Sequence, residues 1–365
     1  MRNLFRGYYK PTPEELVEIW ENCIFSFDAN VLLHIYCYTP ETRERFFEIL
    51  NRLKERIWIP YQVAYEYQKN RIYVISKYFK AYEEIEKLLN KKNQELKSEL
   101  LLEYKQHPVI NIQEILETFE NVIGKVIYQL NEAKNSHPNY LEHDKLREVL
   151  SDLLDGKVGQ PYTEEELENL YQKAEKRFTY QKPPGYKDAN KPVPRSYGDV
   201  ILWFQLIDYA KVQQKSIIFV TDDNKEDWWL KYAGESLEPR PDLIQEILSE
   251  VGGEKFQFYM YHSDQFLDYA EKFLGLPGQP EVIKEAREIM LQSSVNKRIA
   301  VESQYLRSVG YDSSNQVLEI EFQKGEVYHY QDVPATVYAG LMNAASHGKY
   351  FNANIKDVYP YHKLS

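Results

Sequence analysis

The chain of 365 residues has 43% hydrophobic residues, 28% charged residues and a formal net charge of −11. This composition is typical of a folded globular protein, and the length suits one large domain or two. The negative balance argues against bulk electrostatic capture of nucleic acid, although it is compatible with local basic strips. There is no signal-peptide pattern and no stretch near the ~18 apolar residues of a membrane span, so we expect a cytoplasmic protein without a membrane partner. Cys23 and Cys37 have no CxxC partner and the histidines show no paired spacing, so we expect neither a disulfide framework nor a zinc site.

Strand-like and helix-like segments alternate along the first 275 residues. In chain order we expect a helix over 11–20, a strand over 24–27, a helix over 45–53, a strand over 56–60, a helix from 61, a helix over 199–213, a strand over 217–220, a helix over 240–251, a strand over 256–261 and a helix over 263–275. Residues 70–180 are highly charged with apolar residues three or four positions apart, which predicts an inserted helical hairpin or small bundle. The alternation predicts an α/β domain over 1–275, with a mostly parallel sheet flanked by helices.

The last part of the chain has a different pattern. The segment GLPGQP begins a predicted linker and helix over 276–299. Beyond it, VLEIEF and VYHY alternate around QKG, which is a hairpin signal. We therefore expect a second, small α+β domain over 300–365.

Carboxylates stand at the ends of several predicted elements of the first domain. Asp28 ends the first strand, Asp222 and Asp223 leave the strand over 217–220, Glu66 lies early in a helix and Asp199 begins another. The carboxyl ends of parallel strands are where α/β folds place ligands, and Mg²⁺ or Mn²⁺ prefers such oxygen ligands. Two such ions can activate water and stabilise the leaving oxygen of a phosphodiester. Taken singly, each aspartate has an alternative as a helix N-cap, and Glu66 as a surface residue.

Four segments together resemble the PIN-like nuclease family, in its large form with a helical insertion. They are FSFDANVLL, IPYQVAYEYQKNR, YGDVILWFQLIDYA and IIFVTDDNKEDWW, and their order and type match over residues 24 to about 270. The resemblance implies an acidic pocket that uses Mg²⁺ or Mn²⁺ to hydrolyse phosphodiester bonds. The resemblance implies that Asp28, Glu66, Asp199 and Asp223 are the catalytic residues. It implies that the same four residues, together with Asp222, bind the metal. The alternative for Asp222 is to support the metal ligands or to cap a helix.

The resemblance also implies residues that meet the substrate. In chain order these are Asn30, Lys187, Lys191, Arg195, Thr221 and Arg240. The basic ones are positioned to meet phosphate oxygens. Lys187 is equally explained as linker charge, and Arg240 as an arginine at a helix end.

The tail, GEVYHYQDVPATVYAGLMNAASHGKYFNANIKDVY, resembles the KTSC domain. Its most specific part is SHGKYFNANIK at 346–356, which predicts a helix end, a glycine turn and a short extended stretch. Tyr328, Tyr330 and Phe351 are either stacking platforms for bases or the core of this small domain.

These observations favour a metal-dependent nuclease acting on RNA or DNA, and a bacterial defence or toxin-like role fits the family in general. A phosphatase of the haloacid dehalogenase type needs Asp-x-Asp after the first strand, where this chain has Asp28-Ala29-Asn30. A catalytically silent nucleic-acid- or protein-binding scaffold is the alternative, and the acids at all four family positions argue against it. Self-association or a partner protein is expected at the helical insertion or the C-terminal domain.

Overall fold

The computed structural model describes residues 1, 4–189, 193–232, 235–253, 255–294, 299–312, 317–344 and 346–363. Its α-helices are α1 Pro13–Asn22, α2 Ala29–Leu33, α3 Pro40–Leu53, α4 Tyr61–Tyr104, α5 Ile112–Ser136, α6 Lys145–Leu154, α7 Glu164–Thr179, α8 Gly198–Gln213, α9 Pro241–Val251, α10 Ser263–Phe273, α11 Pro280–Ser294, α12 Ala335–Met342 and α13 His347–Asn354. Its strands are β1 Ile24–Phe27, β2 Ile217–Val220, β3 Trp229–Tyr232, β4 Glu235–Pro239, β5 Phe258–Tyr261, β6 Ile299–Ala300, β7 Leu306–Asp312, β8 Val317–Phe322, β9 Val327–Tyr330 and β10 Tyr361–Lys363. Its short 3-10 helices are η1 Arg6–Tyr8, η2 His34–Tyr36, η3 Lys54–Arg56, η4 Tyr186–Asp188 and η5 Arg195–Tyr197.

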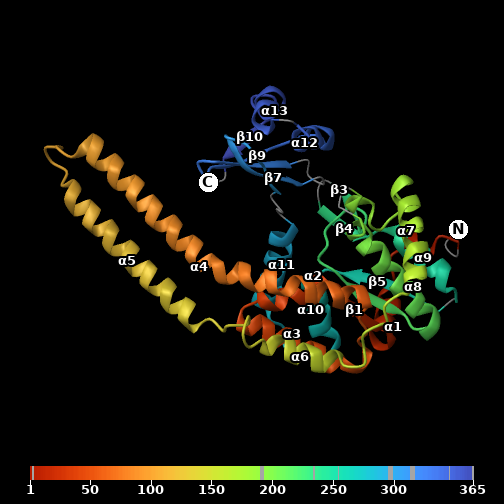
Figure 1. Ribbon diagram of the computed structural model, residues 1–365. Coiled ribbons are helices and arrows are strands. Elements are labelled where there is room, and N and C mark those ends of the chain that lie inside the picture. Colours follow the sequence, from red (N-terminus) through yellow and green to blue (C-terminus); the bar gives the residue numbers. More distant parts are fainter. Residues whose placement is uncertain are drawn as a thin grey trace.

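A parallel sheet in the order β1-β2-β5 lies at the centre of the large domain (Figure 1). The strand sequences IFSF, IIFV and FYMY are almost wholly apolar, as expected for parallel strands covered on both faces. The predicted strand over 56–60 is reduced to two isolated parallel bridges, Phe25 with Ile57 and Ile59 with Val158. The mostly parallel α/β architecture predicted from the sequence is thus confirmed, with a sheet narrower than expected.

Aromatic side chains fix a helical layer to each face of this sheet. On one face Trp20 of α1 packs against Phe25 of β1 and Phe273 of α10, with ring centroids 5.0 and 4.9 Å apart. On the other face Trp203 of α8 packs against Phe258 of β5 at 5.4 Å. Because side chains alternate between the two faces of a strand, these contacts bury both faces.

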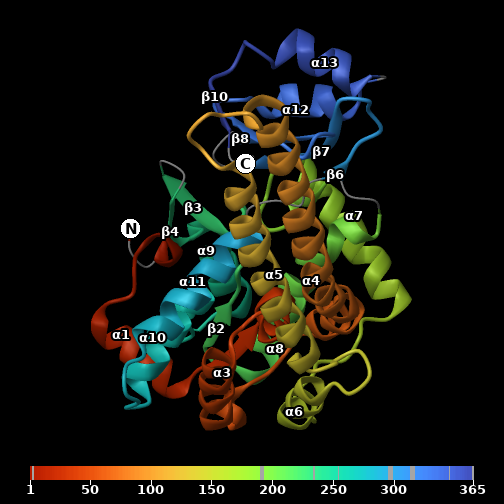
Figure 2. The same ribbon diagram turned by 90° about the vertical axis from the view of Figure 1, so that its left-hand side faces the viewer.

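The predicted insertion contains a helical hairpin. Helix α4 has 44 residues and packs along α5, which has 25, and both project far beyond the body of the domain (Figures 1 and 2). At 1.5 Å per residue α4 is about 66 Å long. Only its first part is anchored on the body, where Val63, Tyr67 and Ile75 are buried.

The C-terminal part forms a separate antiparallel sheet in the order β10-β9-β8-β7-β6, with α12 and α13 beside it. Its core includes Leu306, Ile320, Tyr330 and Phe351, each at most 3% exposed. Tyr330 and Phe351 therefore fill the core, while Tyr328 is only partly buried against it. Among the described residues, no helix combines the length and apolar character that crossing a membrane requires.

We expect Trp20→Ala to destabilise the large domain by about 3–5 kcal/mol, because it empties an aromatic pocket in the core. Trp20 is 2% exposed, whereas Val17 on the same helix is 43% exposed. Val17→Ala is the matched control and should cost less than about 1 kcal/mol. Urea unfolding followed by far-UV circular dichroism measures both, and equal losses would contradict this packing.

Candidate active site

The three strands of the parallel sheet end in register at one edge. Phe27 pairs with Val220, and Val220 pairs with Tyr261, so the next residues of all three strands emerge together. These residues are Asp28, Thr221 and His262. The sheet therefore brings the first predicted acid beside the Thr-Asp-Asp segment that leaves β2.

Both carboxylate oxygens of Asp28 accept hydrogen bonds. Its Oδ1 accepts from the backbone N–H of Ala29 at 2.6 Å, which makes it the N-cap of α2. Its Oδ2 accepts from Asn30 Nδ2 at 2.8 Å and from the Thr221 hydroxyl at 2.6 Å. The capping role that the sequence offered as an alternative is therefore confirmed for Asp28, while its catalytic and metal-binding roles stay predictions.

The side chains of Asn30 and Thr221 accept hydrogen bonds from the backbone of the two aspartates that follow β2. Asn30 Oδ1 accepts from the backbone N–H of Asp222 at 3.1 Å, and Thr221 Oγ1 accepts from that of Asp223 at 3.1 Å. Thr221 is fully buried. Both side chains position the acids, while their contact with substrate stays a prediction.

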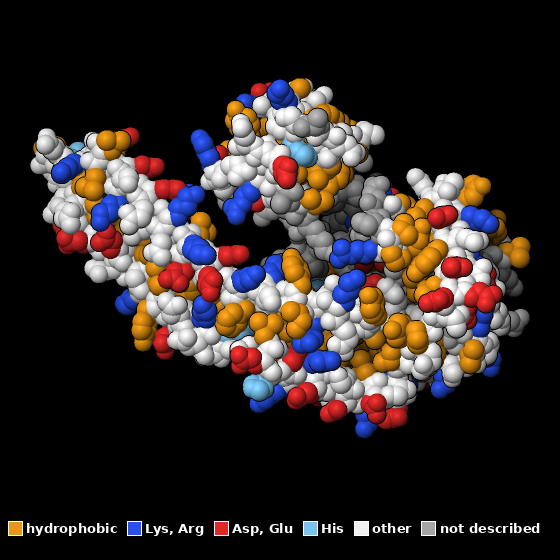
Figure 3. Space-filling view, in the orientation of Figure 1, with side chains coloured by type: hydrophobic (Ala, Val, Ile, Leu, Met, Phe, Trp, Pro, Cys, Tyr) orange, Lys and Arg blue, Asp and Glu red, His pale blue; other side chains and the backbone are white. Residues whose placement is uncertain are grey.

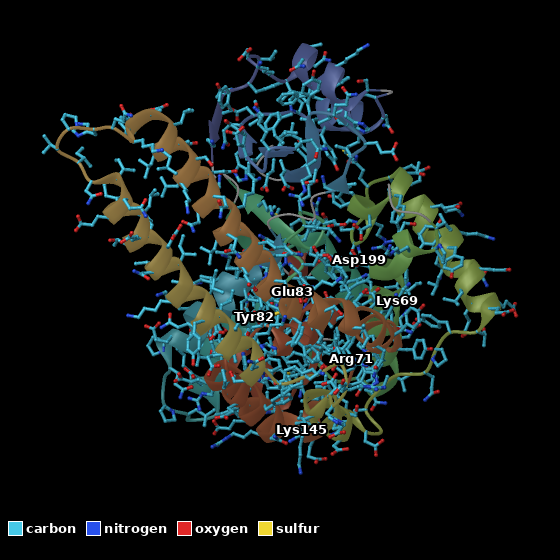
Figure 4. The ribbon with its side chains drawn as sticks, turned by 60° about the vertical axis from the view of Figure 1, so that its left-hand side comes forward. Lys69, Arg71, Tyr82, Glu83, Lys145 and Asp199 are labelled. Carbon is cyan, nitrogen blue, oxygen red and sulfur yellow. The ribbon has the colours of Figure 1, made fainter. Side chains whose placement is uncertain are left out.

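Helices α4 and α8 bring the next two acids. Glu66, in the second turn of α4, accepts a hydrogen bond from Gln62 Nε2 at 2.7 Å. A Cβ atom added to Gly198, the first residue of α8, would stand 2.8 Å from Glu66 Oε1. The glycine thus lets the start of α8, which carries Asp199, approach Glu66 closely, and Figure 4 shows Asp199 on one side of the first turns of α4.

The ammonium group of Lys225 lies among three carboxylates. Its Nζ is 2.6 Å from Asp223 Oδ2, 3.1 Å from Asp188 Oδ2 and 3.2 Å from Asp199 Oδ2. Sequence reasoning did not single out Lys225 or Asp188. Asp188 stands in the segment PPGYKDANK at 183–191, and the signal was an acid in a proline- and glycine-rich stretch shortly before Asp199.

Asp227, which was also missed, fixes the loop that carries Asp188. Its carboxylate is fully buried, and Oδ2 accepts from the backbone N–H groups of Gly185 at 2.8 Å and Lys187 at 3.3 Å. Gly185 has a φ of +97°, where a side chain is strained. The sequence signal for Asp227 was its place in the segment IIFVTDDNKEDWW, directly before two tryptophans.

The adjacent Asp222 and Asp223 point to different partners. Asp222 is buried, with Oδ1 accepting from the backbone N–H of Ser263 at 2.8 Å and Oδ2 lying 2.9 Å from His34 Nδ1. Burial opposes ionisation, but the hydrogen bond and charge of His34 outweigh it and lower the pKa of Asp222. Asp223 instead contacts Lys225. This geometry therefore favours a supporting role for Asp222 over a role as metal ligand.

The proximity of the carboxylates changes the pKa of Asp28. Burial raises the pKa of Asp28 to about 8, against the opposing hydrogen bond from Thr221. The charges of Glu66, Asp199 and Asp223 add to this rise, so all four predicted acids lie within electrostatic reach of one another. Repulsion of this kind is relieved by a cation.

Burial also raises the pKa of Asp227, to about 7, with the charge of Asp199 as the next cause. For Lys225, burial acts to lower the pKa, but the charges of Asp199, Asp223 and Asp188 hold it well above its ordinary value. The lysine is therefore a fixed positive charge in the cluster.

The predicted substrate-binding residues Lys187 and Arg240 contact residues outside the acid cluster. Lys187 pairs with Glu226, with 2.6 Å between Nζ and Oε1. Arg240 Nη1 donates to the backbone carbonyl of Glu226 at 2.8 Å, and Nε donates to Asp242. Arg195 is exposed in η5, and Lys191 lies outside the described residues. Their contact with phosphate stays a prediction.

Comparison with known families agrees with this geometry. The sequence profile of the family described as a PIN like domain matches residues 24–243, which is more than half of the chain. This protein belongs to the PIN-like family. The matched range begins with β1 and ends in α9, so it includes every acid of the cluster and the helical insertion.

A second profile, that of the KTSC domain, matches residues 302–359, which are C-terminal to the PIN-like domain. A short protein of Stutzerimonas stutzeri is 47% identical over 60 residues, which are 16% of this chain and 84% of that protein. A lysine–tRNA ligase of Trichormus variabilis is 42% identical over 64 residues, but the match spans only 11% of the ligase and 18% of this chain. The crystal structure of a KTSC domain protein from Yersinia pestis matches with 35% identity and a TM-score of 0.19, covering 19% of this chain and 97% of that one.

The raised pKa of Asp28 predicts a pH dependence of stability for the PIN-like domain. An unfolded aspartate has a pKa of about 3.9, so between about pH 4 and pH 8 the folded protein keeps a proton that the unfolded chain releases. This contribution to stability is complete below pH 4 and is lost as the pH rises to about 8. In EDTA, the melting temperature of Asp28→Asn minus that of wild type should therefore grow from pH 5 to pH 8.5.

Thermal unfolding across this range, with Asp152→Asn as an exposed control, measures the difference. A difference that stays constant with pH would show that Asp28 is not coupled to the cluster.

Proposed function

We propose that the protein is a metal-dependent nuclease that hydrolyses phosphodiester bonds of RNA or DNA. The observation that carries the proposal is the convergence of carboxylates from β1, α4, α8 and the end of β2 on one place, with a cationic group already among them. Membership of the PIN-like family supports the same reaction. A role in bacterial defence or as a toxin remains part of the proposal.

The donor set fits a divalent metal ion. The residues that would hold it are Asp28, Glu66, Asp199 and Asp223, all oxygen donors of the kind that Mg²⁺ and Mn²⁺ prefer. Asp188 adds a fifth carboxylate to the same cluster. When bound, such an ion supplies activation of water and stabilisation of charge on the phosphate.

Three of the carboxylates surround the ammonium group of Lys225. Among the residues described, no three His, Cys, Asp or Glu side chains form a ready ligand group for a metal ion. Lys225 Nζ contacts Asp199 and Asp223, so it places positive charge beside two of the residues that would hold the ion. The chain's own part in the reaction is then to bind the phosphate with cationic side chains and to keep Asp28 and Glu66 fixed.

The deciding experiment is a cleavage assay on single- and double-stranded RNA and DNA with Mn²⁺, and with EDTA as control. We expect cleavage by wild type that requires the metal and falls by at least about 100-fold in Asp28→Asn, because one ligand charge is lost. Asp152→Asn, in the exposed face of α6, should keep full activity. Absence of cleavage of every substrate by folded wild type would favour the scaffold alternative, whose acids bind a cation without hydrolysis.

The contact between Gly198 and Glu66 offers a second test that keeps every acid. In Gly198→Ala the new Cβ would stand 2.8 Å from Glu66 Oε1, so the carboxylate must move. We expect activity to fall about 10- to 100-fold, since small misplacements of reacting groups have effects of that order. Gly124→Ala on α5 is the control, because its Cβ would meet nothing within 4 Å. Equal activity of both variants would show that the position of Glu66 is unimportant.

A further inference from the structure

One face of α4 carries a row of lysines that begins beside the site. At 100° per residue, five exposed lysines lie within roughly 60° of Glu66 around the helix. They are Lys69, Lys77, Lys80, Lys87 and Lys91. The lysines lie between about −60° and +20° of Glu66, whereas the buried Val63, Tyr67 and Ile75 lie at about +60°, +100° and 180°, so this lysine row faces outward.

The lysine row differs from the other charges of the hairpin. Lys92, Lys97 and Lys134 each lie within 3.0 Å of a glutamate carboxylate, as expected for a solvated helix face. Within the described residues, by contrast, Lys69, Lys77, Lys80 and Lys87 have no carboxylate within 4.0 Å, and Lys91 has one only at 3.8 Å. Between Glu66 and Lys91 only one acid, Glu84, falls within the same arc.

Exposed tyrosines accompany the lysine row near the site. Tyr73 is 72% exposed and lies in the same arc, and Tyr65 is 48% exposed and carries Lys69 Nζ 5.5 Å above its ring. Aromatic rings of this kind stack on unpaired bases, whereas lysines meet the phosphates. In a protein with a net charge of −11, such a row is a local departure from the general balance.

The views agree on where this face lies. In Figure 4, Lys69 and Asp199 lie to one side of α4, and Arg71 and Lys145 lie to the other. Arg71 pairs with Asp144 beside α6, which places it on the anchored side. Figure 3 shows lysine and arginine side chains gathered along the concave edge between the hairpin and the C-terminal domain.

We propose that the lysine row of α4 binds a single-stranded segment of nucleic acid that continues from the acid cluster. This inference rests on the proposed nuclease function and names the substrate class. From Lys69 to Lys91 the row is about 33 Å long, so it can contact a single strand over several nucleotides. Strands too short to reach along the row are then poor substrates.

The first test is binding of a fluorescent 20-nucleotide single strand to the full chain in EDTA, by anisotropy at low salt. The triple variant Lys69→Gln, Lys80→Gln and Lys87→Gln should bind about 10-fold more weakly, and its salt dependence should fall by about two units of slope. The matched control is Lys92→Gln, Lys97→Gln and Lys134→Gln, which removes the same charge and should change affinity less than about 2-fold. Equal loss in both variants, or in neither, would overturn the proposal.

Two further measurements test the kind of strand. Tyr73→Ala should weaken single-strand binding about 3- to 10-fold and leave duplex binding unchanged. An equal effect on single strand and duplex would overturn the single-strand assignment. The substituted side chains are exposed, except those of the control residues Lys97 and Lys134, which are half-buried, and circular dichroism of each variant checks the fold.

Binding in EDTA separates this inference from the proposed function. If wild type binds through the lysine row but cleaves nothing with Mn²⁺, the nuclease proposal fails and the binding surface stands. If wild type cleaves in an Asp28-dependent way while the row variant binds like the control, the surface fails and the nuclease stands.

Discussion

The mutual repulsion of carboxylates at one edge of a small sheet is the constraint on which the rest of the structure depends. Strands that end in register place Asp28 beside the exit of β2, and two helix starts add Glu66 and Asp199. Burial makes this repulsion stronger, because the effective dielectric is low. Lys225 offsets it with a single ammonium group, so the cluster is built to hold positive charge.

The adjacent aspartates after β2 show how two identical groups acquire different tasks. Asp222 ties the end of the strand to His34 and to the start of α10, and it is stabilised as a carboxylate. Asp223 instead points into the cluster, where Lys225 contacts it. The buried hydrogen bonds of Asp222 fix the backbone that carries Asp223. They also give the buried Asp222 carboxylate the partners that it needs, since a charge without partners is costly in the interior.

Much of this arrangement follows from local sequence signals. Apolar runs and helical periodicity predicted the sheet and the hairpin, and the four acids could be listed because each follows a strand or lies near the start of a helix. Asp188 and Asp227 could not, because the loop that carries Asp188 takes its shape from the hydrogen bond that the Gly185 backbone N–H donates to Asp227. The strand expected over 56–60 became single bridges because Ile59 bonds with Lys157 and Gly159 of a distant loop rather than along a full partner strand.

A site rich in carboxylates poses an electrostatic problem for a phosphodiester substrate. The cluster attracts a metal ion but repels the phosphates on either side of the scissile bond, and the net charge of −11 adds to that repulsion. Charges more than about 8–10 Å away are screened at physiological salt, so compensating cations must lie close to the strand. A lysine row that starts one helical turn beyond Glu66 meets this requirement, because it places attraction where the substrate leaves the site. The long helix thus allows an acidic protein to bind an acidic polymer without placing more positive charge within the metal cluster itself.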